Sequence, residues 1–262
     1  MVDTAALLTA YDEHMRTPPG PGPAGLTYEP DGPVIRVVGG HEGRIRAPRD
    51  LGLTGDEVDR LIARQRDYFR ARGEGVEWKV RGHDRPADLG GRLTAAGFTA
   101  EPPSAVLIGL AEEVAAEPVL PDGVVLRATQ ADEDLRRIAD QQTEVWGFDL
   151  SWVADDLRSQ VAAAPDRISI LIAEAGDRLV TSAWAVFHPS HDYVALLGGT
   201  TVPEWRGRGL YRALLAARAG EAAARGCRLL HVDASPDSAP ILRRLGFHEI
   251  TTSTHYRWTP IE

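Results

Sequence analysis

The chain has 262 residues, of which 43% are hydrophobic and 26% are charged, a balance that allows a sizeable core and excludes a disordered chain or a collagen-like rod. At about 150 residues per domain, this length predicts one or two domains. The net charge of −9 argues against a nucleic-acid partner, the single cysteine excludes an intrachain disulfide, and no stretch approaches the ~20 apolar residues of a membrane span. The first residues lack the basic lead of a secretory signal, so we expect a cytoplasmic protein without a membrane partner.

Helices and short strands alternate in the first part of the chain. An amphipathic helix is predicted at 4–14, and the prolines and glycines of 16–25 then predict a break in regular structure. Thr54 and Glu57 have the spacing of a capping box, which opens a second helix. The other elements predicted before residue 111 are strands at 34–38, 44–47, 76–80 and 104–110, and a helix at 86–96.

Residues 111–123 are predicted to form a linker, because they lack a hydrophobic period and end in a Pro-Asp-Gly turn signal. The predicted domains are therefore 1–110 and 124–262. The elements predicted in the second domain are strands at 124–127, 168–175, 179–188, 193–202 and 229–233, helices at 131–145, 209–224 and 235–245, a loop with a short helix at 146–161, and a final pair of strands that ends near 258.

An internal repeat relates the two domains. A shift of 149 residues superposes Gly97-Phe98 on Gly246-Phe247, and it also superposes Asp88 on Asp237 and Leu93 on Leu242. In each half the predicted order is helix, strand, helix, Gly-Phe, strand. This order favours a duplicated α+β fold over a coincidence.

The strongest chemical signal is the segment 198–220. A strand ends near Val202, Pro203 stops its hydrogen-bonded ladder, and Arg206-Gly-Arg-Gly209 then leads into an amphipathic helix. Glycines allow a ligand to approach the backbone, and the free N–H groups at a helix N-terminus bind phosphate. Arg206, Arg208 and Arg212 add positive charge at the same end, so this segment predicts a diphosphate site.

Three other interpretations fit the segment less well. A solvated basic turn would carry the same residues without a ligand. A dinucleotide-binding fingerprint needs Gly-x-Gly-x-x-Gly, whereas the spacing here is Arg-x-x-Gly-x-Tyr. A P-loop needs Gly-Lys-Ser/Thr, which the segment lacks.

Together with the downstream strand, Ser235-Pro-Asp-Ser-Ala and Leu-Gly246-Phe247, the Arg206–Tyr211 motif resembles the GCN5-related N-acetyltransferase (GNAT) family. The resemblance covers about 124–259, and the first half resembles a degenerate partial copy. It implies a tandem protein of two GNAT-like halves, each with a mostly antiparallel twisted sheet flanked by helices. It also implies acetyl-CoA as co-substrate.

Carried over residue by residue, the resemblance implies that the backbones of Thr201 and Val202 bind the pantetheine arm. The pyrophosphate would be held at Arg206 and by the amides of Gly207, Arg208, Gly209, Leu210, Tyr211 and Arg212. Two positions depart from the family pattern. Tyr211 stands where Gly or Ala is usual, and its ring either narrows the site or points away from it. Leu242 stands where many members have the Tyr that protonates the leaving thiolate.

In such an enzyme the acceptor amine attacks the thioester directly. Backbone N–H groups near Val202 would hold the developing oxyanion. The predicted base is Glu144, Asp149 or Asp192, or else a water chain, and Tyr256 is a candidate acid or a packing residue. In the family, the region that contains Trp146, Phe148 and Trp152 lines the acceptor pocket; core packing is the other interpretation of these three aromatic residues.

The predicted function is N-acetyl transfer from acetyl-CoA to a small-molecule amine or a protein amino group, by a monomer or homodimer. The alternatives are a non-catalytic acyl-CoA sensor or regulatory protein, and nucleotide binding by the same loop. The eight histidines lack metal-ligand spacing, so no metal is predicted. Asp56 and Glu57 open the corresponding helix of the first half, so that half is predicted to bind no CoA.

Overall fold

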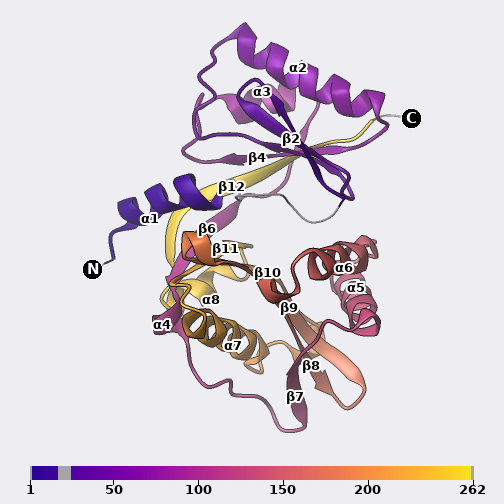
Figure 1. Cartoon of the computed structure of the whole chain (residues 1–262), viewed down its shortest axis with the longest axis vertical. Helices are drawn as coiled ribbons and strands as arrows, with labels where there is room; N and C mark the ends of the chain where they lie inside the picture. The colour runs from indigo at the N-terminus through magenta and orange to yellow at the C-terminus, as the bar shows by residue number, and fades with distance from the viewer. Residues whose placement is uncertain (1, 17–24, 261–262) are drawn as a thin grey trace. The chain divides into compact units, whose positions relative to one another are not determined.

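The computed structural model describes residues 2–16 and 25–260, which form two compact units (Figure 1). Unit 1 comprises Met1–Leu107, Asp233–Arg243 and His248–Glu262, and unit 2 comprises Ile108–Val232 and Arg244–Phe247. The first change of unit lies close to the predicted boundary at 110. Most of the last 30 residues, however, pack with the first half, because the C-terminal strand pairs with a strand of unit 1.

Unit 1 is built on a sheet with strand order β1-β2-β3-β4-β12. All of its neighbouring strands are antiparallel except β3 and β4, and the short β5 pairs with β12. Helices α2 and α3 cover one face of this sheet (Figure 1). The elements that lie wholly in unit 1 are α1 (Thr4–Ala10), a π-helical turn (Tyr11–Met15), β1 (Thr27–Asp31), β2 (Val34–Val38), β3 (Gly43–Arg46), α2 (Asp56–Ala71), β4 (Val76–Arg81), α3 (Leu89–Ala95), β5 (Thr99–Ala100) and β12 (His248–Trp258).

The core of unit 1 follows from the apolar stripe of α2. Val58, Leu61 and Ile62 recur at helical spacing and are fully buried against the sheet. Phe69 continues the stripe and lies over Gly43, where a Cβ atom would come within 2.0 Å of the ring. Only glycine at position 43 allows this helix to approach β3 so closely.

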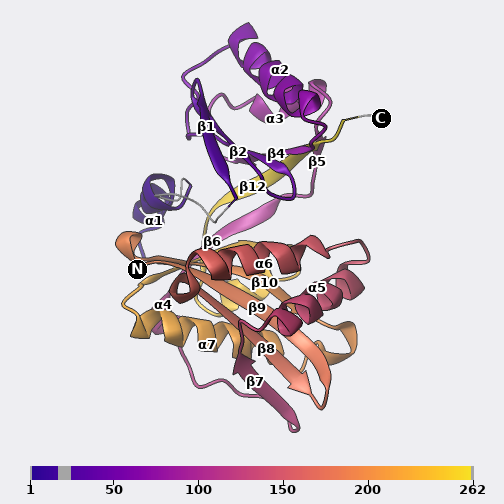
Figure 2. The same ribbon diagram turned by 45° about the vertical axis from the view of Figure 1, so that its right-hand side comes forward.

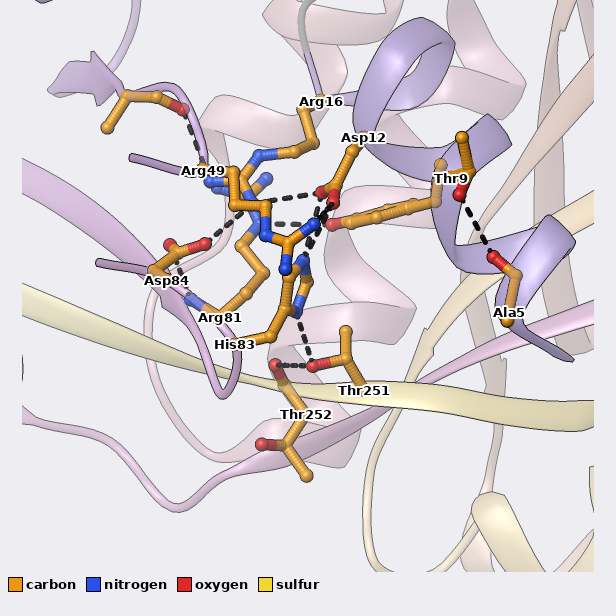
Figure 3. Close-up of polar contacts among 12 residues, drawn as sticks. Ala5, Thr9, Asp12, Arg16, Arg49, Arg81, His83, Asp84, Thr251 and Thr252 are labelled. Carbon is orange, nitrogen blue, oxygen red and sulfur yellow. Dashed lines mark hydrogen bonds and ion pairs between the residues drawn. The ribbon is translucent and has the colours of Figure 1, made fainter. Parts of the chain in front are cut away.

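A buried polar cluster attaches the N-terminal helical segment to unit 1 (Figure 3). The Arg16 guanidinium donates to Asp84 at 2.6 Å and to Asp12 at 3.1 Å. His83 bridges Asp12 and Thr251, with its ring nitrogens 3.0 Å and 2.8 Å from their oxygens. Burial opposes the charge on Arg16, but the two carboxylates outweigh it and raise the pKa of Arg16. All of these side chains have partners within unit 1, so the cluster holds the fold together.

Unit 2 is built on a sheet with strand order β11-β10-β9-β8-β7, antiparallel except for β10 and β11. Side chains alternate along β8: Ile168, Ile170 and Ile172 pack under α5 and α6, whereas Leu171 and Ala173 pack with α7. The helices therefore cover opposite faces of the sheet (Figure 2). Elements wholly in unit 2 are α4 (Ala111–Val114), β7 (Val124–Ala128), α5 (Asp132–Trp146), α6 (Trp152–Ala163), β8 (Ile168–Ala175), β9 (Arg178–His188), β10 (Tyr193–Thr201), α7 (Leu210–Ala224) and 3-10 turns at Pro165–Arg167, Pro189–His191 and Pro203–Trp205.

Three elements run from one unit into the other: β6 (Ser104–Leu110), β11 (Leu229–Ala234) and α8 (Ala239–Arg244). The predicted mixed α+β architecture with mostly antiparallel strands is confirmed. The repeated order is confirmed too, since α2, β4, α3 and β5 correspond to α7, β11, α8 and β12. None of the helices in the described part of the chain is long and apolar enough to cross a membrane.

Three details of the sequence prediction were wrong. The final pair of strands is one strand of 11 residues, β12. The strand β1 was missed because Pro30 and Asp31 signal a loop. The first four residues of the predicted linker form α4. The predicted break at 16–25 falls almost entirely outside the described residues.

Candidate functional site

Strand β10 loses its neighbour on one side halfway along its length. It pairs with β11 only over Tyr193–Ala195, whereas on the other side it pairs with β9 as far as Thr201. In the described structure, residues 196–201 therefore present one backbone edge that no strand covers. Free N–H and C=O groups on such an edge can hydrogen-bond an extended ligand.

A bulge interrupts the same part of β10, between Leu197 and Thr200. Gly198 has φ +62°, a conformation that side chains disfavour. The Trp184 ring lies directly over it, and a Cβ atom on Gly198 would come within 1.8 Å of the ring. Position 198 therefore needs glycine for its backbone conformation and for space.

Two glutamine side chains of α5 hold this bulge in place by hydrogen bonds. Gln142 donates to the carbonyl of Gly198 at 2.9 Å and accepts from the hydroxyl of Thr200 at 3.0 Å. Gln141 donates to the carbonyl of Thr200 at 3.0 Å and accepts from Ser182 at 2.7 Å. All of these side chains are buried.

The two glutamines were not predicted from the sequence. Gln142 stands seven residues after Leu135 and four after Ile138, so it occupies the apolar stripe of the helix. A polar residue in that register was the signal that could have revealed it, because buried amides need partners.

The predicted diphosphate loop follows β10 directly. Gly209, with φ +85°, precedes α7, and a Cβ atom there would meet nothing within 4 Å, so the glycine serves the backbone conformation alone. The first intrahelical bond runs from the N–H of Ala213 to the carbonyl of Gly209. The N–H groups of residues 210–212 therefore project from the start of a 15-residue helix. Leu210 anchors this turn in the core.

The arginines of the loop gather at this helix start. Arg206 donates to the carbonyl of Thr201 at 3.2 Å, and Arg208 stacks over Trp205 at 4.6 Å. Arg206, Arg208 and Arg212 are exposed, and none forms an ion pair with the residues that the structure describes. Three cations beside N–H groups that have no intrahelical acceptor would together favour an anion at this helix start.

Two backbone groups predicted to contact the ligand already have partners. The N–H of Val202 donates to the carbonyl of Val180 at 3.0 Å, so it is not available to an oxyanion. The carbonyl of Thr201 accepts from Arg206. Earlier in the strand, the carbonyls of Leu197, Gly198 and Thr200 also accept from side chains.

The four candidates for acid or base lie in different places. Glu144 pairs with Arg178 at 3.1 Å, and Arg178 also pairs with Glu204 beside the loop. Asp149 caps the turn before α6 by accepting from the N–H of Ser151. The partners in both contacts lie outside the bulge of β10.

Asp192 lies at the wrong end of β10 for the predicted role. Its carboxylate accepts from the N–H of Arg228 at 2.7 Å and pairs with the Arg228 side chain at 2.8 Å. The nine residues of β10 separate it from Val202, about 30 Å at ~3.3 Å per residue. Asp192 therefore fixes the turn that precedes the strand.

Tyr256 belongs to unit 1. It lies on β12 opposite Trp78 of β4 and packs on the apolar core of that unit. Its hydroxyl faces Gly90 of α3, where a Cβ atom would come within 2.2 Å of it. The packing interpretation of this residue is the one that the structure favours.

The three aromatic residues predicted for the acceptor pocket separate into two groups. Trp146 and Phe148 are 52% and 58% exposed, whereas Trp152 packs on the core between α5, α6 and the sheet. The Trp146 indole donates to Gln142 at 3.1 Å. Trp146 therefore contacts the same glutamine that bonds to the bulge of β10.

A cavity of about 300 Å³ adjoins α7. Arg212, Leu215 and Ala216 line it from the helix, and Leu245 and residues 113–116 line it from the other side. Among the described residues, no group of three or more His, Cys, Asp or Glu side chains is placed to hold a metal ion.

The mixed sheet, the one-sided strand and the arginine-rich helix start together place a candidate anion site beside an open strand edge of an α+β fold. Residues 133–247 match the model of the Acetyltransferase (GNAT) family, so this segment is a GNAT domain. No curated protein matches the chain significantly.

Solved structures share the fold over nearly the whole chain. A GCN5-related N-acetyltransferase from Kribbella flavida is 16% identical with a TM-score of 0.67, over 100% of this chain and 97% of that one. A tandem GNAT protein from the clavulanic acid biosynthesis pathway is 15% identical with a TM-score of 0.63, over 99% and 96%. A functionally unknown protein from Staphylococcus epidermidis ATCC 12228 is 11% identical with a TM-score of 0.66, over 89% and 93%. The fold of the whole chain is therefore that of GCN5-related N-acetyltransferases.

Proposed function

We propose that the protein is an acetyl-CoA-dependent N-acetyltransferase whose acceptor amine carries an apolar or aromatic group. The observation that carries this proposal is the start of α7, where N–H groups without an intrahelical acceptor and three arginines without an ion pair among the described residues adjoin the open edge of β10. An anionic, extended ligand such as acetyl-CoA suits both features. Its phosphates would bind at residues 206–212, and its pantetheine amides would follow the edge at 196–201.

The acceptor would approach from the α5 side. Trp146 and Phe148 expose apolar surface there, and the contact of Trp146 with Gln142 brings it beside the bulge. Amine nitrogen attacks the thioester carbonyl, the C–S bond breaks, and the amide and CoA are released. The chain supplies orientation and backbone donors for the carbonyl oxygen, while water carries the amine proton away.

The first half is proposed to bind no acetyl-CoA. Helix α2 corresponds in the repeat to α7, but Asp56, Glu57 and Asp59 occupy its first turn. These carboxylates suit the helix dipole and repel a diphosphate. One acetyl-CoA per chain is therefore expected.

Calorimetric titration with acetyl-CoA tests the loop. Gly209→Glu places a carboxylate at the anion site in a strained conformation, so we expect at least a ~10-fold loss of affinity. Gly220→Glu is the matched control, because it adds the same charge to the same helix about 16 Å further along and meets nothing within 4 Å. Equal binding by Gly209→Glu and the wild-type chain would contradict the proposed site.

A CoA-release assay tests turnover and acceptor class. With 2-phenylethylamine as acceptor, Trp146→Ala and Phe148→Ala should raise KM, whereas with methylamine both variants should match the wild type. The competing candidate is an acyl-CoA sensor, favoured by Leu242, which is buried where a tyrosine is expected. Binding of acetyl-CoA without CoA release on any amine would support the sensor.

A further inference from the structure

Among the described residues, neither position expected to supply an acid can protonate the departing thiolate. Leu242 cannot do so, and Tyr256 packs in the core of unit 1. Helix α7 brings two other polar side chains to the bulge of β10. They stand seven residues apart, which is two helical turns, so they share one face of the helix.

The first of these side chains is Tyr211. Its ring points toward β10, with Cε2 3.1 Å and Cδ2 3.7 Å from the position that a Cβ atom would take on Gly199. Gly199 is the exposed residue beside the bulge. The tyrosine at the unusual motif position therefore narrows the site; it does not point away.

The second is Arg218, which is only 2% exposed. Its guanidinium donates to the carbonyls of Trp184 at 3.1 Å and Leu197 at 3.4 Å. No carboxylate pairs with it among the residues that the structure describes. Burial lowers the pKa of Arg218 to about 10, and the nearby Tyr211 opposes this effect, so the side chain stays charged at neutral pH. A buried cation without a carboxylate partner is costly unless it serves another group.

Building on the proposed function, we propose that Tyr211 is the acid that protonates the CoA thiolate, and that Arg218 stabilises the resulting tyrosinate. The thioester must lie between the phosphates at the start of α7 and the acceptor beside Trp146. That stretch of β10 is the bulge that Tyr211 and Arg218 both reach. The missing tyrosine of α8 is thus replaced by one on α7.

The step balances without another reactant. As the amine nitrogen bonds to the carbonyl carbon, the C–S electron pair leaves on sulfur, and the Tyr211 O–H proton passes to that sulfur. The nitrogen loses one proton to water, and the tyrosinate regains one from water. Arg218 favours the transfer because a neighbouring cation stabilises the charged phenolate.

The test is steady-state kinetics of CoA release with acetyl-CoA and 2-phenylethylamine. Tyr211→Phe removes a single oxygen atom, and we expect kcat to fall by about 10²-fold while KM for acetyl-CoA stays within about threefold. In the wild type we expect kcat to fall at alkaline pH, where the acid loses its proton, and this fall should be absent from the variant. Tyr193→Phe is the matched control, since it lies at the other end of β10.

Arg218→Met separates electrostatics from packing. It should move the alkaline fall of kcat to higher pH, because the phenolate loses its cation, whereas a purely structural arginine would leave the pH of that fall unchanged. A wild-type kcat in Tyr211→Phe would overturn the assignment and leave the proposed function intact. Acetyl-CoA binding without CoA release by the wild-type chain would overturn both.

Discussion

Replacement of Gln142 by leucine should loosen the bulge on which the proposed site depends. Leucine has a similar size but cannot bond to the carbonyl of Gly198 or the hydroxyl of Thr200. Each buried polar group left without a partner costs about 1–3 kcal/mol, so the two together cost about 2–6 kcal/mol of unfolding free energy. The Trp146 indole adds little, because it is half exposed and water can replace its partner.

Urea denaturation measures the loss of unfolding free energy. Hydrogen exchange of peptides from 193–201 then shows whether the loss is located in β10. We expect a lower urea midpoint, faster exchange in β10 and weaker acetyl-CoA binding. Gln160→Leu is the control on α6, where the amide bonds only to Asp156 near the surface, and its stability should change by less than about 0.5 kcal/mol. A Gln142→Leu variant with the stability and exchange of the wild type would refute the role assigned to this network.

Two other predictions concern stability. Burial raises the pKa of Glu77, but His255, Arg257 and Lys79 outweigh it and lower that pKa from 4.5 to about 2. The charged Glu77 carboxylate therefore stabilises unit 1 above pH 4.5 by about 3 kcal/mol, and this contribution is lost as the pH falls toward 2. The stability of Glu77→Gln should fall less steeply than that of the wild type as the pH is lowered. Identical acid titrations of the two proteins would refute the role assigned to Glu77. Gly198→Ala combines a strained backbone with a clash against Trp184, so chemical unfolding should show a loss of about 2–4 kcal/mol, whereas Gly220→Ala in α7 should be neutral or stabilising.

Local patterns predicted most elements but not their partners. The stripe of α2 and the glycines around Arg208 are short-range signals, and both led to correct elements. A strand reveals which residues alternate but not which strand lies beside it, so the pairing of β12 with β4 was not predicted.

The site residues show the same difference between short-range sequence signals and long-range contacts. The predicted diphosphate loop is continuous in sequence, so local spacing alone suggested it, and its ligand stays a prediction. Asp192 and Tyr256 were chosen by residue type, and the fold placed one at the far end of β10 and the other in a separate core. Gln142 and Arg218 act through tertiary contacts, which composition and spacing do not encode.

The return of the chain to unit 1 at β12 affects how the protein can be made. Six residues of β12 pair with β4, and Trp258 completes the core that α2 begins. During synthesis the first unit cannot be completed until β12 has been translated. A fragment that stops at the predicted linker would leave the edge of β4 bare, and bare edges invite aggregation. The first half is therefore not a separable module, and its expression alone should require β12 to be supplied as a peptide.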